Sequence, residues 1–530
     1  MVAKTLQGLE QVLAQELVNL GAADVQPGRR VVTFTGDLAM MYKANFCLRT
    51  ALRVLKPIKE FTAYNADEVY DAVKQIDWND YLTLNTSFAI DSVVYSEEFR
   101  HSKFVAYRVK DAIVDFFREQ TGQRPNISVS NPDIRLNIHI NNDNDCTLSL
   151  DSSGESLHKR GYRVATVESP INEVLAAGML LMTGWHGECD LIDPMCGSGT
   201  IAIEAALLAR NVWPGVFHTE KYAFENWPDF NSDLLQEIYN DDSNERTFNH
   251  RIIAHDIDPA AVNAAAANAR SAGVSDCMEI KVERFEDFTQ PEQPTLMITN
   301  PPYGERISSP DLPGLYRTIG DKLKHQFVGN EAWMISYREE LFDKIGLKPS
   351  IKVPLFNGAL ECELRKYQIF EGGFKEFRHE GGEIKTDDER RMMREKRELP
   401  RRREFNNRRQ REQDNDDEIP EYLRLRHRSF VVTQRRRERE AQEARPRRDD
   451  DRRFENNDRR FNNDNKRFGN RDRRFGNDDR RDGNRDRKFG NRDRRYDNRR
   501  SGEGESRSQQ HNRPSRQHNR SPWARKSRED

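Results

Sequence analysis

The stretch Asn300-Pro301-Pro302-Tyr303 combines residue types that can hold an amine attached to an aromatic ring. Such an amine is a poor nucleophile because its lone pair is delocalised into the ring. If the side-chain oxygen of Asn300 and the peptide oxygen of Pro301 accept its two N–H bonds, the nitrogen is drawn toward sp³ geometry and its lone pair becomes available. The prolines fix the direction of that carbonyl, and Tyr303 offers a face on which an extruded nucleobase can stack. The alternative is a proline-rich strand-end turn with an Asn cap.

A second stretch, Asp193-Pro194-Met195-Cys196-Gly197-Ser198-Gly199-Thr200, has the composition of a nucleoside-binding turn. Two glycines two positions apart let the backbone approach a ligand closely, and the helix that begins there has free N–H groups. The third glycine of a dinucleotide fingerprint is absent, and so is the Gly-Lys-Ser/Thr of a P-loop. We therefore expect a nucleoside-type cofactor near Gly197, Gly199 and the start of the helix at Thr200.

Further acidic positions suit the same cofactor. Asp256 ends an apolar run about 60 residues after the glycine turn, where a carboxylate can accept hydrogen bonds from both ribose hydroxyls. Asp258 precedes Pro259 and mainly suits the N-cap of a helix. Asp287 and Phe288 are candidates for the edge and the face of an adenine pocket, with an ordinary surface turn as the alternative.

These turns belong to a region in which strand and helix patterns alternate. A helix pattern at 171–185 is followed by strand, turn and helix at 189–210 and again at 251–274, and by a further strand that ends at the Asn-Pro-Pro-Tyr turn. Alternating buried strands and helices predict an α/β fold with a parallel, doubly wound, Rossmann-like sheet. Ligands bind such sheets at the carboxyl ends of the strands, which is where all three turns fall.

The front half of the chain has a different pattern. Apolar residues recur at helical spacing over 6–20, a helix is expected from Asp37, and an amphipathic helix is expected over 104–122. The segment 134–151 alternates apolar and polar residues around Asn141-Asn142-Asp143-Asn144, which is a hairpin signal. We expect an α+β unit.

The connector between the two halves, Leu-His-Lys-Arg-Gly-Tyr-Arg, holds three cations around a tyrosine. One interpretation is a solvated linker. The other is an RNA-contacting edge, in which Lys159, Arg160 and Arg163 meet phosphates and Tyr162 stacks on a base.

The cysteines and the apolar runs exclude several protein classes. Six scattered cysteines without a C-x-x-C pair or a His cluster argue against a disulfide framework and against a zinc site, so no metal is expected. The N-terminus has charged residues inside its apolar pattern, unlike a signal peptide, and no run approaches the roughly 18 apolar residues of a membrane span. We expect a reduced, cytoplasmic protein with no membrane partner.

The last 155 residues differ in composition from the rest. Residues 376–530 hold 49 Lys+Arg against 35 Asp+Glu, which leaves 37 basic and 53 acidic residues in the remainder. A seven-residue repeat with one aromatic ring in most copies runs over 452–498, and its Gly and Asn content excludes a coiled-coil seam. We expect a disordered tail that is either a solvated spacer or a sequence-tolerant RNA binder.

Taken together, the three turns resemble the motifs of class I S-adenosylmethionine-dependent methyltransferases that act on exocyclic amines. The span from the N-terminus to about Phe370 resembles the THUMP-containing rRNA guanine-N2 methyltransferases, with supporting motifs at 157–163, 169–181, 224–230 and 355–370.

The resemblance implies a ferredoxin-like region at 1–45, an RNA-binding THUMP domain at 46–155 and a methyltransferase domain at 165–372. It also implies that S-adenosylmethionine donates the methyl group and that a guanine of 23S rRNA accepts it. By the same resemblance Asp193, Gly197, Gly199, Asp256 and Asp287 contact the donor, while Asn300, Pro301 and Tyr303 hold the guanine.

Three other functions stay open at this point. A tRNA guanine-N2 methyltransferase is the nearest, because the same site would serve it. A DNA adenine-N6 methyltransferase shares Asn-Pro-Pro-Tyr, but the chain has no evident DNA target-recognition domain. A non-catalytic RNA chaperone would depend on the tail. A Cys196 nucleophile is disfavoured because this residue lies inside the glycine turn without a neighbouring base.

Overall fold

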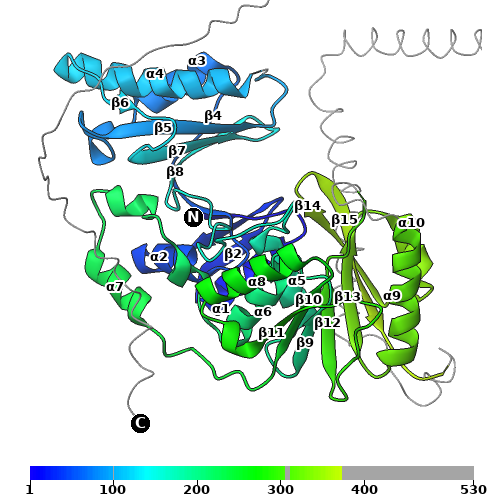
Figure 1. Ribbon diagram of the computed structural model, residues 1–530. Helices are drawn as coiled ribbons and strands as arrows, with labels where there is room; N and C mark the ends of the chain where they lie inside the picture. The colour runs from blue at the N-terminus through cyan, green and yellow to red at the C-terminus, as the bar shows by residue number, and fades with distance from the viewer. Residues whose placement is uncertain (100, 305–310, 373–530) are drawn as a thin grey trace, which may run out of the picture. The chain divides into compact units, whose positions relative to one another are not determined.

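The structure is a computed structural model that describes residues 1–99, 101–304 and 311–372. The expected tail at 376–530, its repeat at 452–498, and Glu305 and Arg306 lie outside the described residues. Within the described part, the strands form two sheets with helices packed against them (Figure 1). This arrangement confirms the expected fold class, an α+β front region followed by an α/β domain.

The first sheet is built by the front half of the chain. Its eight strands lie in the order β2-β3-β1-β4-β8-β7-β5-β6. The expected hairpin is present, because β7 and β8 pair antiparallel around the Asn141 turn. The strands are β1 (Val2–Lys4), β2 (Ala23–Pro27), β3 (Val31–Thr35), β4 (Arg53–Thr62), β5 (Ser87–Val94), β6 (Asn126–Ile127), β7 (Ile134–Ile140) and β8 (Asp145–Asp151).

Helices α2 and α4 have the end signals that the sequence indicates. Asp37 caps α2 (Leu38–Cys47), since its carboxylate accepts a 2.8 Å hydrogen bond from the Met40 N–H. The helix α4 (Ser102–Thr121) ends at Gly122, whose φ of 72° is left-handed. The remaining helical segments are α1 (Glu10–Asn19), α3 (Ala66–Lys74) and a short 3₁₀ turn (Trp78–Asp80).

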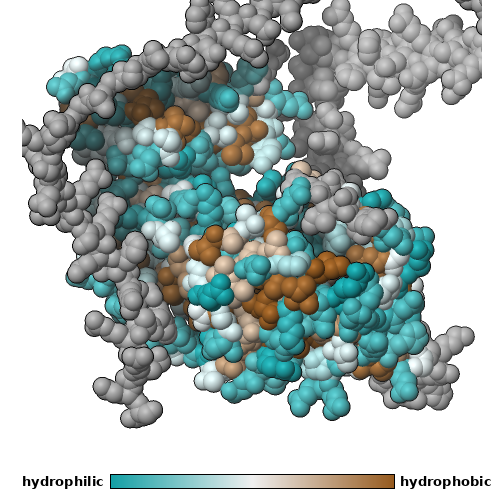
Figure 2. All heavy atoms as spheres, viewed as in Figure 1, coloured by the Kyte–Doolittle hydropathy of each residue, from teal (hydrophilic) through white to brown (hydrophobic). Residues whose placement is uncertain are grey.

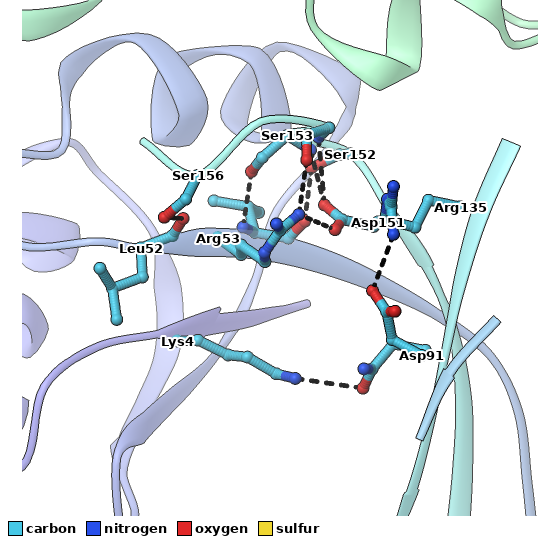
Figure 3. Close-up of polar contacts among 12 residues, drawn as sticks. Lys4, Leu52, Arg53, Asp91, Arg135, Asp151, Ser152, Ser153 and Ser156 are labelled. Atoms are coloured by element: carbon cyan, nitrogen blue, oxygen red, sulfur yellow. Dashed lines mark hydrogen bonds and ion pairs between the residues drawn. The ribbon is translucent and has the colours of Figure 1, made fainter. Parts of the chain in front are cut away.

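Strand β4 joins the earliest strands to the rest of the first sheet. Its beginning pairs with β1 at Val2↔Leu55, and from Leu55 on it pairs with β8. Polar side chains close this junction: Arg53 forms an ion pair with Asp151 and donates a 2.6 Å hydrogen bond to the Gly154 carbonyl (Figure 3). The sheet is therefore continuous across residues 53–62, and the front region is one folded unit.

The second sheet has the order β11-β10-β9-β12-β13-β15-β14. Neighbouring strands from β11 to β13 run parallel, as expected, whereas β15 and β14 add an antiparallel hairpin at one edge. This hairpin was not expected from the sequence. The strands are β9 (Asp190–Asp193), β10 (Ile252–Asp256), β11 (Met278–Val282), β12 (Thr295–Thr299), β13 (Glu331–Ser336), β14 (Ile351–Asn357) and β15 (Leu360–Gln368).

Helices surround the parallel part of this sheet (Figure 1). In the part of the chain that the structure describes, no helix is long and apolar enough to cross a membrane. Figure 2 shows hydrophobic residues gathered near the positions of α5 and β10 in Figure 1. The helices are α5 (Glu173–Thr183), α6 (Thr200–Ala209), α7 (Ser232–Asn240), α8 (Pro259–Ser271), α9 (Leu312–Gln326) and α10 (Glu339–Ile345), with 3₁₀ turns at Pro214–Phe217, Ala223–Asn226 and Ser275–Cys277.

The two sheet regions exchange core residues. Leu9 packs in the core of the second sheet, where a Cβ on Gly178 would lie 2.6 Å from its Cδ2. In the other direction, Phe224 stacks on Tyr42 with ring centroids 4.2 Å apart and belongs to the core of the first sheet. The motif at 224–230 is therefore explained by packing against the front region.

Candidate active site

The three turns meet at one edge of the second sheet. They follow β9, β10 and β12, and β9 lies between the other two strands with parallel pairing on both sides. Because the carboxyl ends of parallel strands lie at the same edge, the glycine turn, the Asp256 turn and the Asn300 turn are neighbours. This confirms the expected placement of the turns at strand ends.

The two glycines of the first turn have different surroundings. Both have left-handed backbone, with φ of 54° at Gly197 and 81° at Gly199. A Cβ on Gly199 would lie 3.0 Å from the Cβ of Ala265, so this glycine permits close packing of α6 against α8. Among the described residues, a Cβ on Gly197 would meet only Val167, at 3.9 Å, which leaves room for a ligand beside the backbone.

The turn is also held by two side chains, one from the connector and one from helix α8. Arg163 donates hydrogen bonds to the Ser198 hydroxyl at 3.0 Å and the Thr200 hydroxyl at 2.9 Å, and it forms a 2.7 Å ion pair with Glu173. Asn268 is fully buried and donates a 3.0 Å hydrogen bond to the Ser198 carbonyl. The connector and helix α8 thus fix the shape of the glycine turn.

The carboxylate of Asp256 accepts hydrogen bonds within the site and can accept further ones. Its Oδ2 accepts a 2.8 Å hydrogen bond from the Gly197 N–H, and its Oδ1 accepts one of 2.9 Å from the Asp258 N–H. A carboxylate has about four lone-pair directions, so two further donors can be accepted. The prediction for Asp258 is confirmed, because its side chain caps α8 through the Ala260 N–H.

Apolar surface lies beside these polar groups. Ile257, which follows Asp256 directly, is 57% exposed, and Val282 at the end of the neighbouring strand β11 is 54% exposed. Asp287 is exposed, whereas Phe288 is only 3% exposed and packs in a cluster with Phe285 and Phe327. The prediction of Phe288 as an adenine-stacking ring is therefore wrong, since its faces are covered by the core.

Asp193 lies beneath the turn and bonds to the strand that carries Asn300. Its Oδ1 accepts a 2.8 Å hydrogen bond from the Thr299 hydroxyl. Burial raises the pKa of Asp193 to about 7, although the Thr299 hydroxyl and the Met195 N–H oppose the shift. Burial also raises the pKa of the Cys196 thiol well above its ordinary value, which agrees with the expectation that Cys196 is no nucleophile.

The Asn300 turn presents an acceptor that nothing described satisfies. Asn300 Oδ1 is buried, and no residue that the structure describes donates a hydrogen bond to it. Pro301 is buried, and Tyr303 is partly exposed. The Tyr303 ring packs edge-on against Tyr337 with centroids 5.3 Å apart, so it has a defined orientation. The three residues therefore offer a buried amide acceptor beside a partly exposed aromatic ring.

Two of the connector residues lack the exposure that the RNA-contacting interpretation requires. Arg160 is 2% exposed and donates a 2.7 Å hydrogen bond to the Leu157 carbonyl, while Tyr162 is 1% exposed and donates to Glu204 at 3.0 Å. A buried ring cannot stack on a base, so the RNA role predicted for these two residues is wrong. Arg163 instead donates hydrogen bonds to the glycine turn. Of the four connector residues, Lys159 alone has a mostly exposed side chain, paired with Glu155.

Residues that the sequence analysis missed support the site from outside the three turns. Thr299 bonds to Asp193, Asn268 bonds to the glycine turn, and Asn357 donates a 2.7 Å hydrogen bond to the Tyr303 hydroxyl. For Thr299 and Asn357 a signal was available, because one ends a strand beside Asn300 and the other precedes a glycine in a hairpin pattern. Asn268 lies inside an alanine-rich helix, and no local pattern distinguishes it.

Comparison with known proteins agrees with this architecture. Family models match an RlmL ferredoxin-like domain at residues 1–55, a THUMP domain at 63–151 and an RMKL-like methyltransferase domain at 160–366. A putative RNA methyltransferase of Synechocystis is 39% identical over 371 residues, which are 69% of this chain and 96% of that protein.

Two further relatives extend the comparison. The ribosomal RNA large subunit methyltransferase K/L of Syntrophotalea carbinolica is 40% identical over 69% of this chain, which spans 53% of that protein, or about half its length. The crystal structure of a putative methyltransferase complexed with SAH superposes with a TM-score of 0.63 and 29% identity, over 70% of this chain and 98% of that one. With its ferredoxin-like, THUMP and catalytic domains in this order, the chain belongs to the RMKL-like family of methyltransferases.

Proposed function

We propose that this enzyme transfers a methyl group from S-adenosylmethionine to the exocyclic N2 amine of a guanine in 23S rRNA. The buried oxygen of Asn300, for which no described residue supplies a donor, carries the proposal. A buried acceptor without a donor costs about 1–3 kcal/mol, and such a cost is retained where a ligand supplies the missing donor. An exocyclic amine brings that donor, and its second N–H can bond to the Pro301 carbonyl.

The other side of the site suits the methyl donor. Gly197 leaves room beside its backbone, Asp256 has spare lone pairs for two ribose hydroxyls, and Ile257 offers an apolar surface for adenine. S-adenosylmethionine, when bound, supplies an electrophilic methyl group on a sulfonium. The residues present therefore fit this donor, with Asp193 as the acid next to the turn.

The reaction requires positioning more than acid–base chemistry. In the transfer, the guanine nitrogen would take up the methyl group as the bond between that carbon and the sulfur of the donor breaks. The nitrogen then carries a positive charge and loses a proton to water. A neutral amide at Asn300 suffices as the hydrogen-bond acceptor throughout, because the proton leaves a nitrogen that is already cationic.

The relatives support rRNA as the acceptor class. The K/L proteins are named for the large ribosomal subunit. The matched THUMP domain precedes the catalytic domain in the chain, and we assign it the capture of the RNA. An rRNA substrate also implies cytoplasmic action. A target base inside a helix must be extruded at a cost of a few kcal/mol, which contacts of the front region with RNA would offset.

The test uses the full chain with S-adenosylmethionine and, in parallel, 23S rRNA, tRNA and duplex DNA, followed by mass spectrometry of the nucleosides. We expect N2-methylguanosine from 23S rRNA. The Asn300→Ala variant should lose transfer by at least about 100-fold while its donor affinity in calorimetry is unchanged. Asn300→Asp, which keeps an acceptor oxygen, should retain part of the activity. An active Asn300→Ala enzyme, or methylation of tRNA or of adenine in DNA instead, would refute the proposal.

A further inference from the structure

The turn of the β14–β15 hairpin lies against the Asn300 turn, far away in sequence. Asn357, the last residue of β14, donates a 2.7 Å hydrogen bond from Nδ2 to the hydroxyl oxygen of Tyr303. Asn357 pairs with Leu360 in the hairpin register, so the turn is tight, and Gly358 has a φ of 65°. The antiparallel edge of the sheet thereby contacts a residue of the acceptor-base site.

Other contacts hold the backbone of Tyr303 and the plane of its ring. The Tyr303 carbonyl accepts a 3.4 Å hydrogen bond from Arg338, which holds the backbone. Tyr337 packs edge-on against the ring at 83° and sets the plane of the ring. The hydroxyl oxygen lies on the axis about which the ring rotates, so the bond from Asn357 fixes the direction of that axis. Backbone, plane and axis are then each held by a different residue.

We propose that Asn357 is a positioning residue that holds Tyr303 as the stacking surface for the acceptor base. The inference rests on the proposed function, because it needs a base between the ring and the methyl donor. Displacement of reacting groups by about 1 Å can reduce a rate by about 100-fold. A ring that is free to swing about χ1 would place the amine away from Asn300 for part of the time, and the loss would appear in kcat.

Asn357 also has a simpler role that the test must exclude, because asparagine before glycine favours a tight hairpin turn. Two substitutions remove the same hydrogen bond from opposite sides: Asn357→Leu removes the amide, and Tyr303→Phe removes the hydroxyl but keeps the ring. Only the first alters the hairpin. Glu361→Gln, at an exposed position of the same hairpin, is the matched control.

The experiment measures kcat, KM and donor affinity for the full-length wild type, the two single variants, their double variant and the control. We expect each single variant to lower kcat about tenfold with donor affinity within twofold of wild type, and the double variant to be no slower than either single one. Asn357→Asp, whose carboxylate can accept from the Tyr303 hydroxyl, should recover much of the rate. If Asn357→Leu fails to fold, Tyr303→Phe, which removes the same bond and leaves the hairpin unchanged, carries the test together with Asn357→Asp.

The inference is overturned if Asn357→Leu behaves like Glu361→Gln, if the two losses multiply in the double variant, or if Asn357→Leu weakens donor binding. The measurement uses whichever nucleic acid the wild type methylates, because stacking on a tyrosine is tolerant of base identity. A tRNA or DNA acceptor would therefore contradict the proposed substrate while leaving the coupling between Asn357 and Tyr303 measurable.

Discussion

Thr299 donates a 2.8 Å hydrogen bond to Asp193, and both residues are almost completely buried, at 0% and 1% exposure. Thr299 directly precedes Asn300, and Asp193 begins the glycine turn. This bond therefore joins the end of the strand that carries the acceptor site to the end of the strand that carries the donor site. The relative position of the two substrates depends on it.

Replacement of Thr299 by valine tests this link. The change keeps the shape of the side chain but removes the hydroxyl, so a buried carboxylate loses a donor at a cost of about 1–3 kcal/mol. We expect a lower free energy of unfolding in urea and a several-fold lower rate in single turnover, and both should be restored in Thr299→Ser. If Thr299→Val matches wild type in both measurements, the bond does not align the sites.

The pH dependence of stability should reveal Asp193. Its pKa of about 7 in the folded state lies above the value of 3.8 for an exposed aspartate, so between these values the folded protein binds the proton more tightly than the unfolded chain. The free energy of unfolding contributed by this group therefore falls as pH rises from about 4 to about 7, by at most 1.4 kcal/mol per pH unit.

Asp193→Asn should remove that component. Urea denaturation at pH 5 and pH 8 should show a smaller loss of stability with rising pH in the variant than in the wild type, whatever the absolute stability of the variant. An equal loss in the two proteins would mean that Asp193 titrates normally in the folded state.

Arg163 and Lys159 lie four residues apart and should affect different ligands. Arg163→Leu leaves Ser198, Thr200 and Glu173 without their partner, so the glycine turn should loosen and donor affinity should fall about 10- to 100-fold in calorimetry. Lys159→Ala, at an exposed side chain, should leave donor affinity unchanged. Weaker RNA binding in Arg163→Leu, measured at equal salt and with donor affinity intact, would reinstate the RNA-contacting edge.

Substitutions at the two glycines of the turn should affect different properties, donor binding at Gly197 and stability at Gly199. Alanine at either position has a left-handed backbone, which costs about 1–2 kcal/mol. In Gly199→Ala the new Cβ would lie only 3.0 Å from the Cβ of Ala265, so the melting temperature should fall further. Gly197→Ala should mainly weaken donor binding, because its Cβ would fill the space beside the backbone and meets Val167 only at 3.9 Å. Thermal denaturation without donor, compared with calorimetric titration of the donor, distinguishes the two. The reverse pattern would contradict the assignment of Gly197 to the donor.

The sequence was sufficient where function requires local residue types. The glycine turn, Asp256 and the Asn300 turn are each defined by neighbours in the chain, and the rule that ligands bind at strand ends then brings them together. The Asp37 cap and the Gly122 stop are local in the same sense, which is why α2 and α4 were predicted well.

The sequence was insufficient where the role of a residue depends on its burial. Lys159-Arg160-Gly161-Tyr162-Arg163 reads as a polar surface segment, yet Arg160 and Tyr162 are enclosed because Glu204 on α6 and the Arg49 carbonyl of the front region supply buried partners. Those partners lie more than 40 residues away, so no window of sequence contains the reason. The prediction for Phe288 was wrong for the same reason, because its ring stacks on Phe327, the residue that follows α9.

The hairpin β14–β15 shows a third kind of omission. Asn357-Gly358 between two alternating segments is a strong hairpin signal, but the expectation of a purely parallel sheet left no place for it. The antiparallel edge is the element that brings Asn357 to Tyr303.

Gly8 has a left-handed φ of 96°, and a Cβ there would lie 2.6 Å from the Pro354 carbonyl oxygen of β14. Together with Leu9 in the core of the second sheet, this contact makes the amino-terminal segment a part of the catalytic body rather than an appendage. Any residue with a side chain at position 8 would therefore require a matched change in the β14–β15 hairpin.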